Sequence, residues 1–161
     1  MERARSIVGY LIGFTLFVVL VPALMWFVAG GVSFSTPRTV VFVVLAVAGL
    51  GLSLWSIVYM KRVGKGHPMD AFNHEFAPRT SELMTSGPYA FCRNPMVLGV
   101  IVYYLGVLVL LGSAKPLIVF AIYLLIMGVQ VSREEVRLQE DFGQAYSDYK
   151  KTTKRLIPFI W

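Results

Sequence analysis

The sequence predicts an all-α, integral membrane helical bundle of about four transmembrane helices. The last two form a tight hairpin, and a cytoplasmic connecting loop and a C-terminal amphipathic helix complete the fold. Two observations lead to this class. Of the 161 residues, 57% are hydrophobic and only 15% are charged, whereas soluble domains carry about 25% charged residues. The apolar residues also gather in four long runs, and the mean hydropathy of the chain is +0.67.

The four apolar runs are residues 7–28, 39–60, 96–112 and 116–131. The first is about 33 Å long as a helix at 1.5 Å per residue, which is enough to cross a bilayer. It is too long for the hydrophobic core of a signal peptide, so we expect an uncleaved span. The last two runs are near the lower limit for crossing about 30 Å of hydrocarbon. Because only Ser-Ala-Lys separates them, they predict a tight hairpin.

Basic residues predict the orientation of the chain. Thirteen of the fifteen Lys and Arg residues lie in the amino-terminal segment, in the loop of residues 61–95 or in the tail of residues 132–161. Only Arg38 and Lys115 lie on the other side, and all nine acidic residues share the side of the thirteen. The positive-inside rule therefore places both termini and the loop in the cytoplasm. We expect a single membrane domain in the inner (plasma) membrane of a prokaryote.

Two other function classes are poorly supported. The net charge is +6, but so few charged residues do not suit a nucleic-acid groove. The single cysteine excludes an internal disulfide and a CxxC metal site. The spacing of His67, Asp70, His74 and Glu75 matches no zinc pattern, so we expect no metal.

The tail after Val131 has the pattern of an amphipathic helix, with Ser132 as its N-cap and Glu135 completing a capping box. Its tyrosines are expected at the lipid headgroups and its last lysines on anionic lipid. The adjacent Glu134 and Glu135 do not suit anionic lipid. We expect a cation to meet them, either Arg93 or a cationic ligand.

Small residues in the first run suggest close helix contacts. Gly9 and Gly13 form a GxxxG pattern, which fits packing within the monomer or a homodimer seam.

Residues 86–99, SGPYAFCRNPMVLG, place two prolines and an arginine where the third run begins. Proline fixes the backbone, so this segment presents its arginine rigidly. With the hairpin, the Glu-Glu pair and the FGQAYSDYKKTTKRLIPFI tail, it resembles the isoprenylcysteine carboxyl methyltransferases and their phospholipid N-methyltransferase relatives. The resemblance covers the chain from about Gly64 onward.

The pattern shared by these families is R-H-P-x-Y-x-G, followed one helical hairpin later by E-E. The residues that fit it are Arg93, Pro95, Gly99, Glu134 and Glu135. Two positions depart from it, since Asn94 replaces the usual histidine and Val97 the usual tyrosine.

The resemblance implies a methyltransferase that uses S-adenosylmethionine on a lipid-like acceptor, which enters sideways from the bilayer at the cytoplasmic face. It implies catalytic roles for Glu134, Glu135 and Arg93, whose guanidinium can pair with the cofactor carboxylate. Gln130 and Glu134 are implied to contact the acceptor. The positions that align with cofactor contacts are Leu83, Met84, Tyr89, Arg93, Asn94, Pro95, Met96, Val97 and Gly99, the last allowing close approach to the ligand.

The acceptor remains open between two chemistries. A phospholipid amine must lose a proton, which Glu134 or Glu135 could take. A carboxylate needs a cation to hold it, but Gln130 stands where the carboxyl methyltransferases have an arginine. Two further readings are a non-catalytic membrane scaffold and a reductase of the sterol reductase type. For the latter, the chain has too few helices and no dinucleotide fingerprint.

Overall fold

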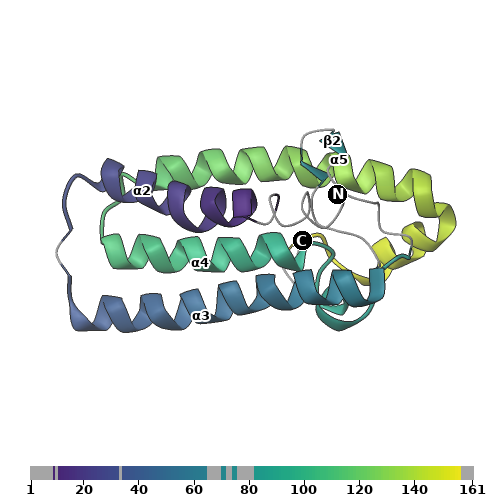
Figure 1. The fold of residues 1–161 in the computed structure, drawn as a ribbon, viewed down its shortest axis with the longest axis horizontal. Coiled ribbons are helices and arrows are strands. Elements are labelled where there is room, and N and C mark those ends of the chain that lie inside the picture. The colour runs from purple at the N-terminus through teal and green to yellow at the C-terminus, as the bar shows by residue number, and fades with distance from the viewer. Residues whose placement is uncertain are drawn as a thin grey trace.

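The computed structural model describes residues 9, 11–32, 34–64, 70–71, 74–75 and 82–156. The predicted all-α membrane bundle is confirmed (Figure 1). Two short strands, Asp70–Ala71 (β1) and His74–Glu75 (β2), pair antiparallel within the central loop. The helical elements are the π-helix η1 (Thr15–Leu20), α2 (Val21–Ala29), α3 (Thr36–Tyr59), the π-helical turn η2 (Met60–Gly64), the 3-10 turn η3 (Gly87–Ala90), α4 (Pro95–Leu111) and α5 (Leu117–Thr152).

Three continuous helices are long and apolar enough to cross a membrane, namely Leu11–Ala29, Thr36–Gly64 and Leu117–Thr152. The shorter α4 is apolar throughout. Each of these helices carries most of the described part of one predicted run, while the points at which the chain enters and leaves the bilayer stay predictions. Their outward side chains are largely Leu, Ile, Val, Phe and Trp, as expected of helices that face lipid.

Local sequence sets the helix ends. Pro37 stands in the first turn of α3 after the extended Ser35, and Pro95 begins α4, where the missing proline N–H costs nothing. At the other ends, Gly30 and Gly112 take left-handed φ angles of 73° and 58° after α2 and α4, a conformation that glycine adopts without a Cβ clash.

The first helix contains a π-helical turn that is hydrogen-bonded to α4. Within η1, the Val21 N–H bonds the Leu16 carbonyl five residues back, a wider spacing than in an α-helix. Tyr103 Oη donates to the Val18 carbonyl at 3.1 Å, and Tyr104 Oη donates to the Phe17 carbonyl at 2.8 Å. Both hydroxyls are thereby satisfied inside an apolar bundle, where an unmade hydrogen bond is costly.

Helices α3 and α4 pack most closely because glycines face each other. A Cβ added at Gly49 would collide with the Gly99 carbonyl and with the Tyr103 backbone. The Ser53 hydroxyl donates to the Met96 carbonyl at 2.9 Å across the same contact. Small residues therefore let these two backbones touch, as is common between membrane helices.

The short connection between α4 and α5 brings their aromatic rings together. The centroids of Tyr104 and Tyr123 are 4.7 Å apart in an edge-on arrangement. Met25 and Ala29 of α2 belong to the same buried cluster, so α2 packs against both helices (Figure 1).

Helix α5 runs from the predicted fourth span into the tail without a new start. The capping-box prediction is wrong, because the Ser132 hydroxyl donates to the Gly128 carbonyl at 2.8 Å inside the helix. The helix breaks only at Gly143, with φ 52° and ψ −121°. After this break the chain turns back, and Tyr146 and Tyr149 are buried in the protein rather than placed at the lipid headgroups as expected.

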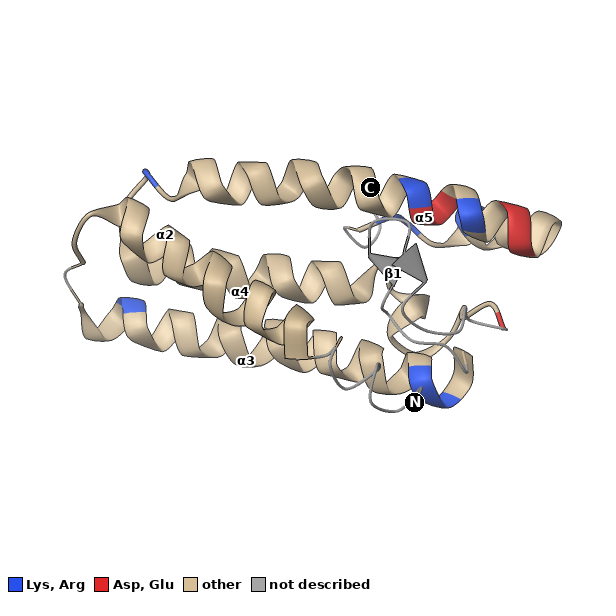
Figure 2. Ribbon diagram, turned by 45° about the horizontal axis from the view of Figure 1, so that its top comes forward, with Lys and Arg blue, Asp and Glu red and all other residues tan. Residues whose placement is uncertain are grey.

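Charged residues of the described chain gather at one end of the bundle (Figure 2). Arg38, in the first turn of α3, and Lys115, in the α4–α5 connection, mark the opposite end. The separation agrees with the distribution that underlies the orientation prediction, while the cytoplasmic assignment itself stays a prediction.

We predict that Gly49→Ala lowers the free energy of unfolding by about 1–3 kcal/mol, because the new methyl group meets rigid backbone in α4. Gly51→Ala, on the same helix, has nothing within 4 Å of its added Cβ and should unfold like the wild type. Thermal unfolding in detergent micelles measures both. Equal midpoints for the two variants would contradict the close α3–α4 contact.

Candidate active site

A cavity of about 420 Å³ lies between the first helix, the start of α4 and α5. Its lining changes along α5, from Val119, Ile122 and Ile126 to the polar Gln130 and Glu134. The apolar part is completed by Leu16, Phe17, Val21, Leu24, Tyr123 and Met127, and the polar part by Glu82, Tyr89, Arg93, Asn94, Tyr146 and Tyr149. The cavity therefore joins an apolar region at the depth of the spans to a polar region at the charged end.

Side chains on the rim of the apolar part are exposed. Leu24 of α2 and Ile122 and Ile126 of α5 each line the cavity and have about half of their surface accessible. Since these helices face lipid, the apolar part can open toward the hydrocarbon rather than toward water.

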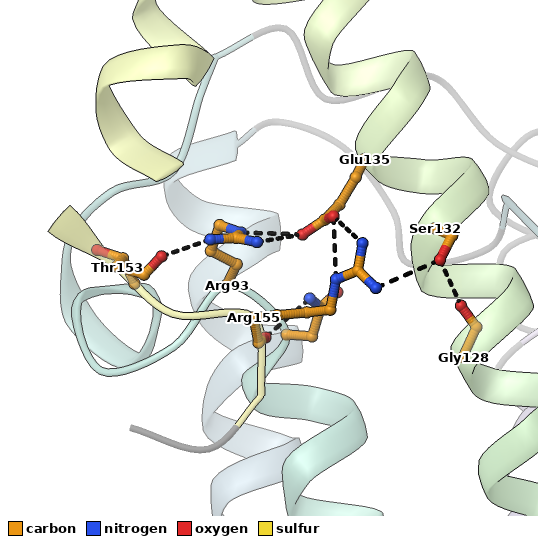
Figure 3. Close-up of polar contacts among 7 residues, drawn as sticks. Arg93, Gly128, Ser132, Glu135, Thr153 and Arg155 are labelled. Atoms are coloured by element: carbon orange, nitrogen blue, oxygen red, sulfur yellow. Dashed lines mark hydrogen bonds and ion pairs between the residues drawn. The ribbon is translucent and has the colours of Figure 1, made fainter. Parts of the chain in front are cut away.

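Beside the polar part of the cavity, the carboxylate of Glu135 is held by two guanidiniums (Figure 3). Arg93 Nε and Nη2 donate to Glu135 Oε1 at 2.9 and 2.7 Å. Arg155 donates through Nε to Glu135 Oε2 at 3.0 Å and forms a second bond to this oxygen through Nη2. Arg93 Nη1 also donates to the Thr153 carbonyl at 2.5 Å. Both Glu135 oxygens are thus occupied by charge-assisted hydrogen bonds, which are stronger than neutral ones.

The chain after α5 is fastened to the start of α4 by its backbone. The Arg93 N–H donates to the Lys154 carbonyl at 2.8 Å, and the Asn94 N–H to the Arg155 carbonyl at 3.2 Å. The Asn94 amide donates to this same Arg155 carbonyl at 3.0 Å. Leu156 then packs on Val97 and Val131. These contacts bring the proline-rich segment and the tail together beside the cavity.

Two tyrosines from the helix after Gly143 reach the polar part of the cavity. Tyr149 Oη donates to the Tyr89 carbonyl at 2.6 Å. Tyr146 is fully buried and lines the cavity as well. Its hydroxyl proton has no acceptor among the residues that the structure describes.

The pKa of Glu135 is set by two opposing effects. Burial would raise the pKa of this carboxyl, but hydrogen bonds and charge from Arg155 and Arg93 outweigh burial, so the pKa lies below its ordinary value. The carboxylate is therefore ionised at neutral pH and is a weak base. Its role in this structure is to hold the two arginines.

Comparison of the sequence with known protein families identifies a family for this chain. Residues 37–145 match the phospholipid methyltransferase family, a segment that includes α3, α4, the acidic pair and most of α5. The chain belongs to this family.

The chain is also similar to proteins named protein-S-isoprenylcysteine O-methyltransferase. The mouse protein-S-isoprenylcysteine O-methyltransferase is 34% identical over 93 residues, which cover 55% of this chain and 33% of the mouse protein. A protein of the same name from Schizosaccharomyces pombe is 31% identical over 94 residues, covering 56% of this chain and 40% of the yeast protein. The matched region thus spans about a third of the length of the mouse relative. No solved structure matches the chain.

Most residues predicted for the site line the cavity of this phospholipid methyltransferase family member. Two do not. Glu135 is absent from the lining because Arg93 and Arg155 hold it. Gly99, expected to give room to a ligand, instead gives room to Gly49 and Ser53 of α3. The predicted residues that line the cavity are Leu83, Met84, Tyr89, Arg93, Asn94, Pro95, Met96, Val97, Gln130 and Glu134.

Sequence reasoning missed the contribution of the first helix and of the segment after Gly143. Leu16 and Phe17 gave no signal, because a lipid-facing helix and a cavity-lining helix have the same composition. Tyr146 and Tyr149 did carry one, since they stand three residues apart on one helical face just after a glycine. The metal candidate His67 lies outside the described residues, as do the side chains of its proposed partners.

We predict that Glu135→Gln lowers stability near neutral pH by about 1–3 kcal/mol, because it leaves two partly buried guanidiniums without their counter-charge. Since the folded-state pKa is lowered, the stabilisation is complete above the ordinary carboxyl pKa of about 4.3. It is lost as pH falls through the folded-state pKa. Thermal unfolding of the wild type between neutral and acid pH should show this loss, and the variant should lack it.

Asp148→Asn is the matched control for this prediction. Asp148 pairs with Lys151 at 2.7 Å on the exposed surface, where an ion pair contributes little. Its removal should leave the unfolding midpoint and its pH profile unchanged. If the unfolding midpoint of Glu135→Gln changed with pH in the same way as that of the wild type, the ion pairs of Glu135 with Arg93 and Arg155 would not govern stability in acid.

Proposed function

We propose that the protein is an S-adenosylmethionine-dependent methyltransferase acting on a lipid-like acceptor at the cytoplasmic face of a prokaryotic inner membrane. The observation that carries the proposal is the single cavity that joins a polar, carboxylate-bearing region to an apolar region with an exposed rim. An amphipathic acceptor fits such a cavity, with its head beside Glu134 and its chain between α2 and α5. Family membership and the curated O-methyltransferase relatives support the reaction class.

The residues present fit the methyl donor by their chemistry. S-adenosylmethionine supplies a methyl group on a sulfonium cation, beside an ammonium and a carboxylate. The cavity offers the Glu134 carboxylate for a cation, the buried Tyr146 hydroxyl for an acceptor atom, and Leu83 and Met84 as apolar wall. These residues would hold the donor at the polar end, next to the start of α4.

The protein's contribution to the reaction is position and charge. Methyl transfer is a direct displacement, so the chain need supply no covalent intermediate. The Arg93–Glu135–Arg155 network fixes the segment at the start of α4 and the tail after α5 relative to each other. In this proposal Arg93 and Glu135 act as positioning residues, and Glu134 faces the ligands.

A phospholipid amine acceptor is the second candidate, and the charges of the cavity favour it. Two of the described lining residues, Glu82 and Glu134, are acidic, and the basic lining residue Arg93 is paired with Glu135. Gln130 is uncharged. An amine head suits these charges, and Glu134 would take the proton that the amine must lose before its lone pair can react.

The GxxxG pattern of the first helix supports a homodimer as a further part of the proposal. Of its two glycines, Gly9 is buried in the monomer, whereas a Cβ added at Gly13 would meet nothing within 4 Å, so among the described residues the Gly13 position leaves room for a second helix.

The deciding experiment incubates purified protein in lipid nanodiscs with radiolabelled S-adenosylmethionine and either an amine lipid or a prenylated cysteine carboxylate. We expect label in the amine lipid. Glu134→Gln should reduce turnover by about 100-fold or more, the size of a general-base contribution. Transfer to the carboxylate alone would select the carboxyl methyltransferase reading.

Lys151→Ala is the control, because Lys151 is exposed and outside the cavity. It should turn over at the wild-type rate. A folded wild-type protein that neither binds the cofactor nor transfers label would show that it is a non-catalytic scaffold.

A further inference from the structure

Tyr146 is a buried polar side chain whose hydroxyl proton finds no acceptor in the described part of the fold. The residue has no exposed surface, it lines the cavity, and its hydroxyl proton has no acceptor among the described residues. Its neighbour one turn on, Tyr149, shows the usual arrangement, since its hydroxyl donates to the Tyr89 carbonyl. Buried hydroxyls are nearly always bonded, so the exception at Tyr146 requires an explanation.

The missing partner of Tyr146 is an acceptor. Burial and the carboxylates of Glu135 and Glu134 raise the pKa of the phenol well above its ordinary value, with Arg93 acting in the opposite direction. The hydroxyl therefore keeps its proton. Arg93 lies close enough to lower this pKa through a hydrogen bond as well as through its charge, but a guanidinium only donates, so it cannot accept the phenolic proton.

The surroundings of Tyr146 place this donor in the polar part of the cavity. Arg93 beside it is fixed by Glu135, and Tyr89 and Tyr149 line the same part. The lipid-facing rim belongs instead to Leu24, Ile122 and Ile126. A molecule seated among the polar residues therefore reaches the phenol, whereas an apolar chain at the rim lies in the other part of the cavity.

We propose that Tyr146 is a ligand-contacting residue whose hydroxyl donates a hydrogen bond to an acceptor atom of the bound methyl donor. This inference rests on the proposed function, and it assigns a donor-binding role to a residue outside the R-x-P-x-x-x-G and Glu-Glu pattern. The break at Gly143 makes the contact possible, because it returns the following helix to the cavity.

Tyr146→Phe in the full-length protein tests the proposal by binding rather than turnover. Calorimetric titration with S-adenosylhomocysteine, which shares the carboxylate, ribose and adenine acceptors of the donor, should give an affinity about tenfold weaker than that of the wild type. This is the size of one buried hydrogen bond. The unfolding midpoint of the ligand-free variant should be unchanged or raised, because the substitution removes a hydroxyl whose proton the protein leaves without an acceptor.

Tyr149→Phe is the matched variant, since it removes a hydroxyl that is bonded within the protein. Its ligand-free unfolding midpoint should fall, in contrast to that of Tyr146→Phe. A fall of the midpoint in both variants would overturn the proposal, because the Tyr146 hydroxyl would then have a partner inside the fold.

Three binding results also decide against the proposal. Equal affinities of wild type and Tyr146→Phe for S-adenosylhomocysteine overturn it and leave the proposed function intact. Equal affinities accompanied by a raised KM for the acceptor lipid assign the hydrogen bond to the lipid instead. A wild type that does not bind S-adenosylhomocysteine overturns both this inference and the proposed function.

Discussion

The structure depends on one carboxylate, that of Glu135, held between two guanidiniums. Arg93 precedes α4, Glu135 lies in α5 and Arg155 follows it, so a single charge cluster joins three parts of the chain that are distant in sequence. Even partial burial of these ions is costly. The cost is offset because both Glu135 oxygens accept hydrogen bonds from a guanidinium. The same geometry keeps Glu135 out of the cavity lining, whereas Glu134, one residue earlier, lines the cavity.

The different surroundings of Glu134 and Glu135 follow from the geometry of the helix. Adjacent residues on an α-helix point about 100° apart, so Glu134 can line the cavity while Glu135 points toward Arg93 and Arg155. One faces the ligand space and its neighbour faces the tail. One helix can therefore present a carboxylate to the cavity and, one residue later, a carboxylate that holds the two arginines.

The sequence alone was sufficient to predict the helical membrane fold, since long apolar runs leave few alternatives. It also predicted that Arg93 and the acidic pair lie together. It did not separate the roles of Glu134 and Glu135, because their orientation depends on where the tail returns. That return is set by Gly143, whose left-handed conformation is not evident in a charged helical pattern. The role of Gly99 was misassigned because glycine gives the same signal beside a ligand and beside a helix.

The π-helical turn near the start of the chain has a consequence for how the protein is made. The Phe17 carbonyl receives its bond from Tyr104, which follows it by 87 residues. While the ribosome is still synthesising the intervening segment, this bond is unavailable to the first helix in the bilayer. If the first helix left the membrane insertion machinery before α4 was made, its π-helical turn would lie in hydrocarbon without its tyrosine donors. The contacts of the first helix with Tyr103 and Tyr104 can therefore form only once α4 has been synthesised, so the earliest part of the chain completes its native contacts with a later one.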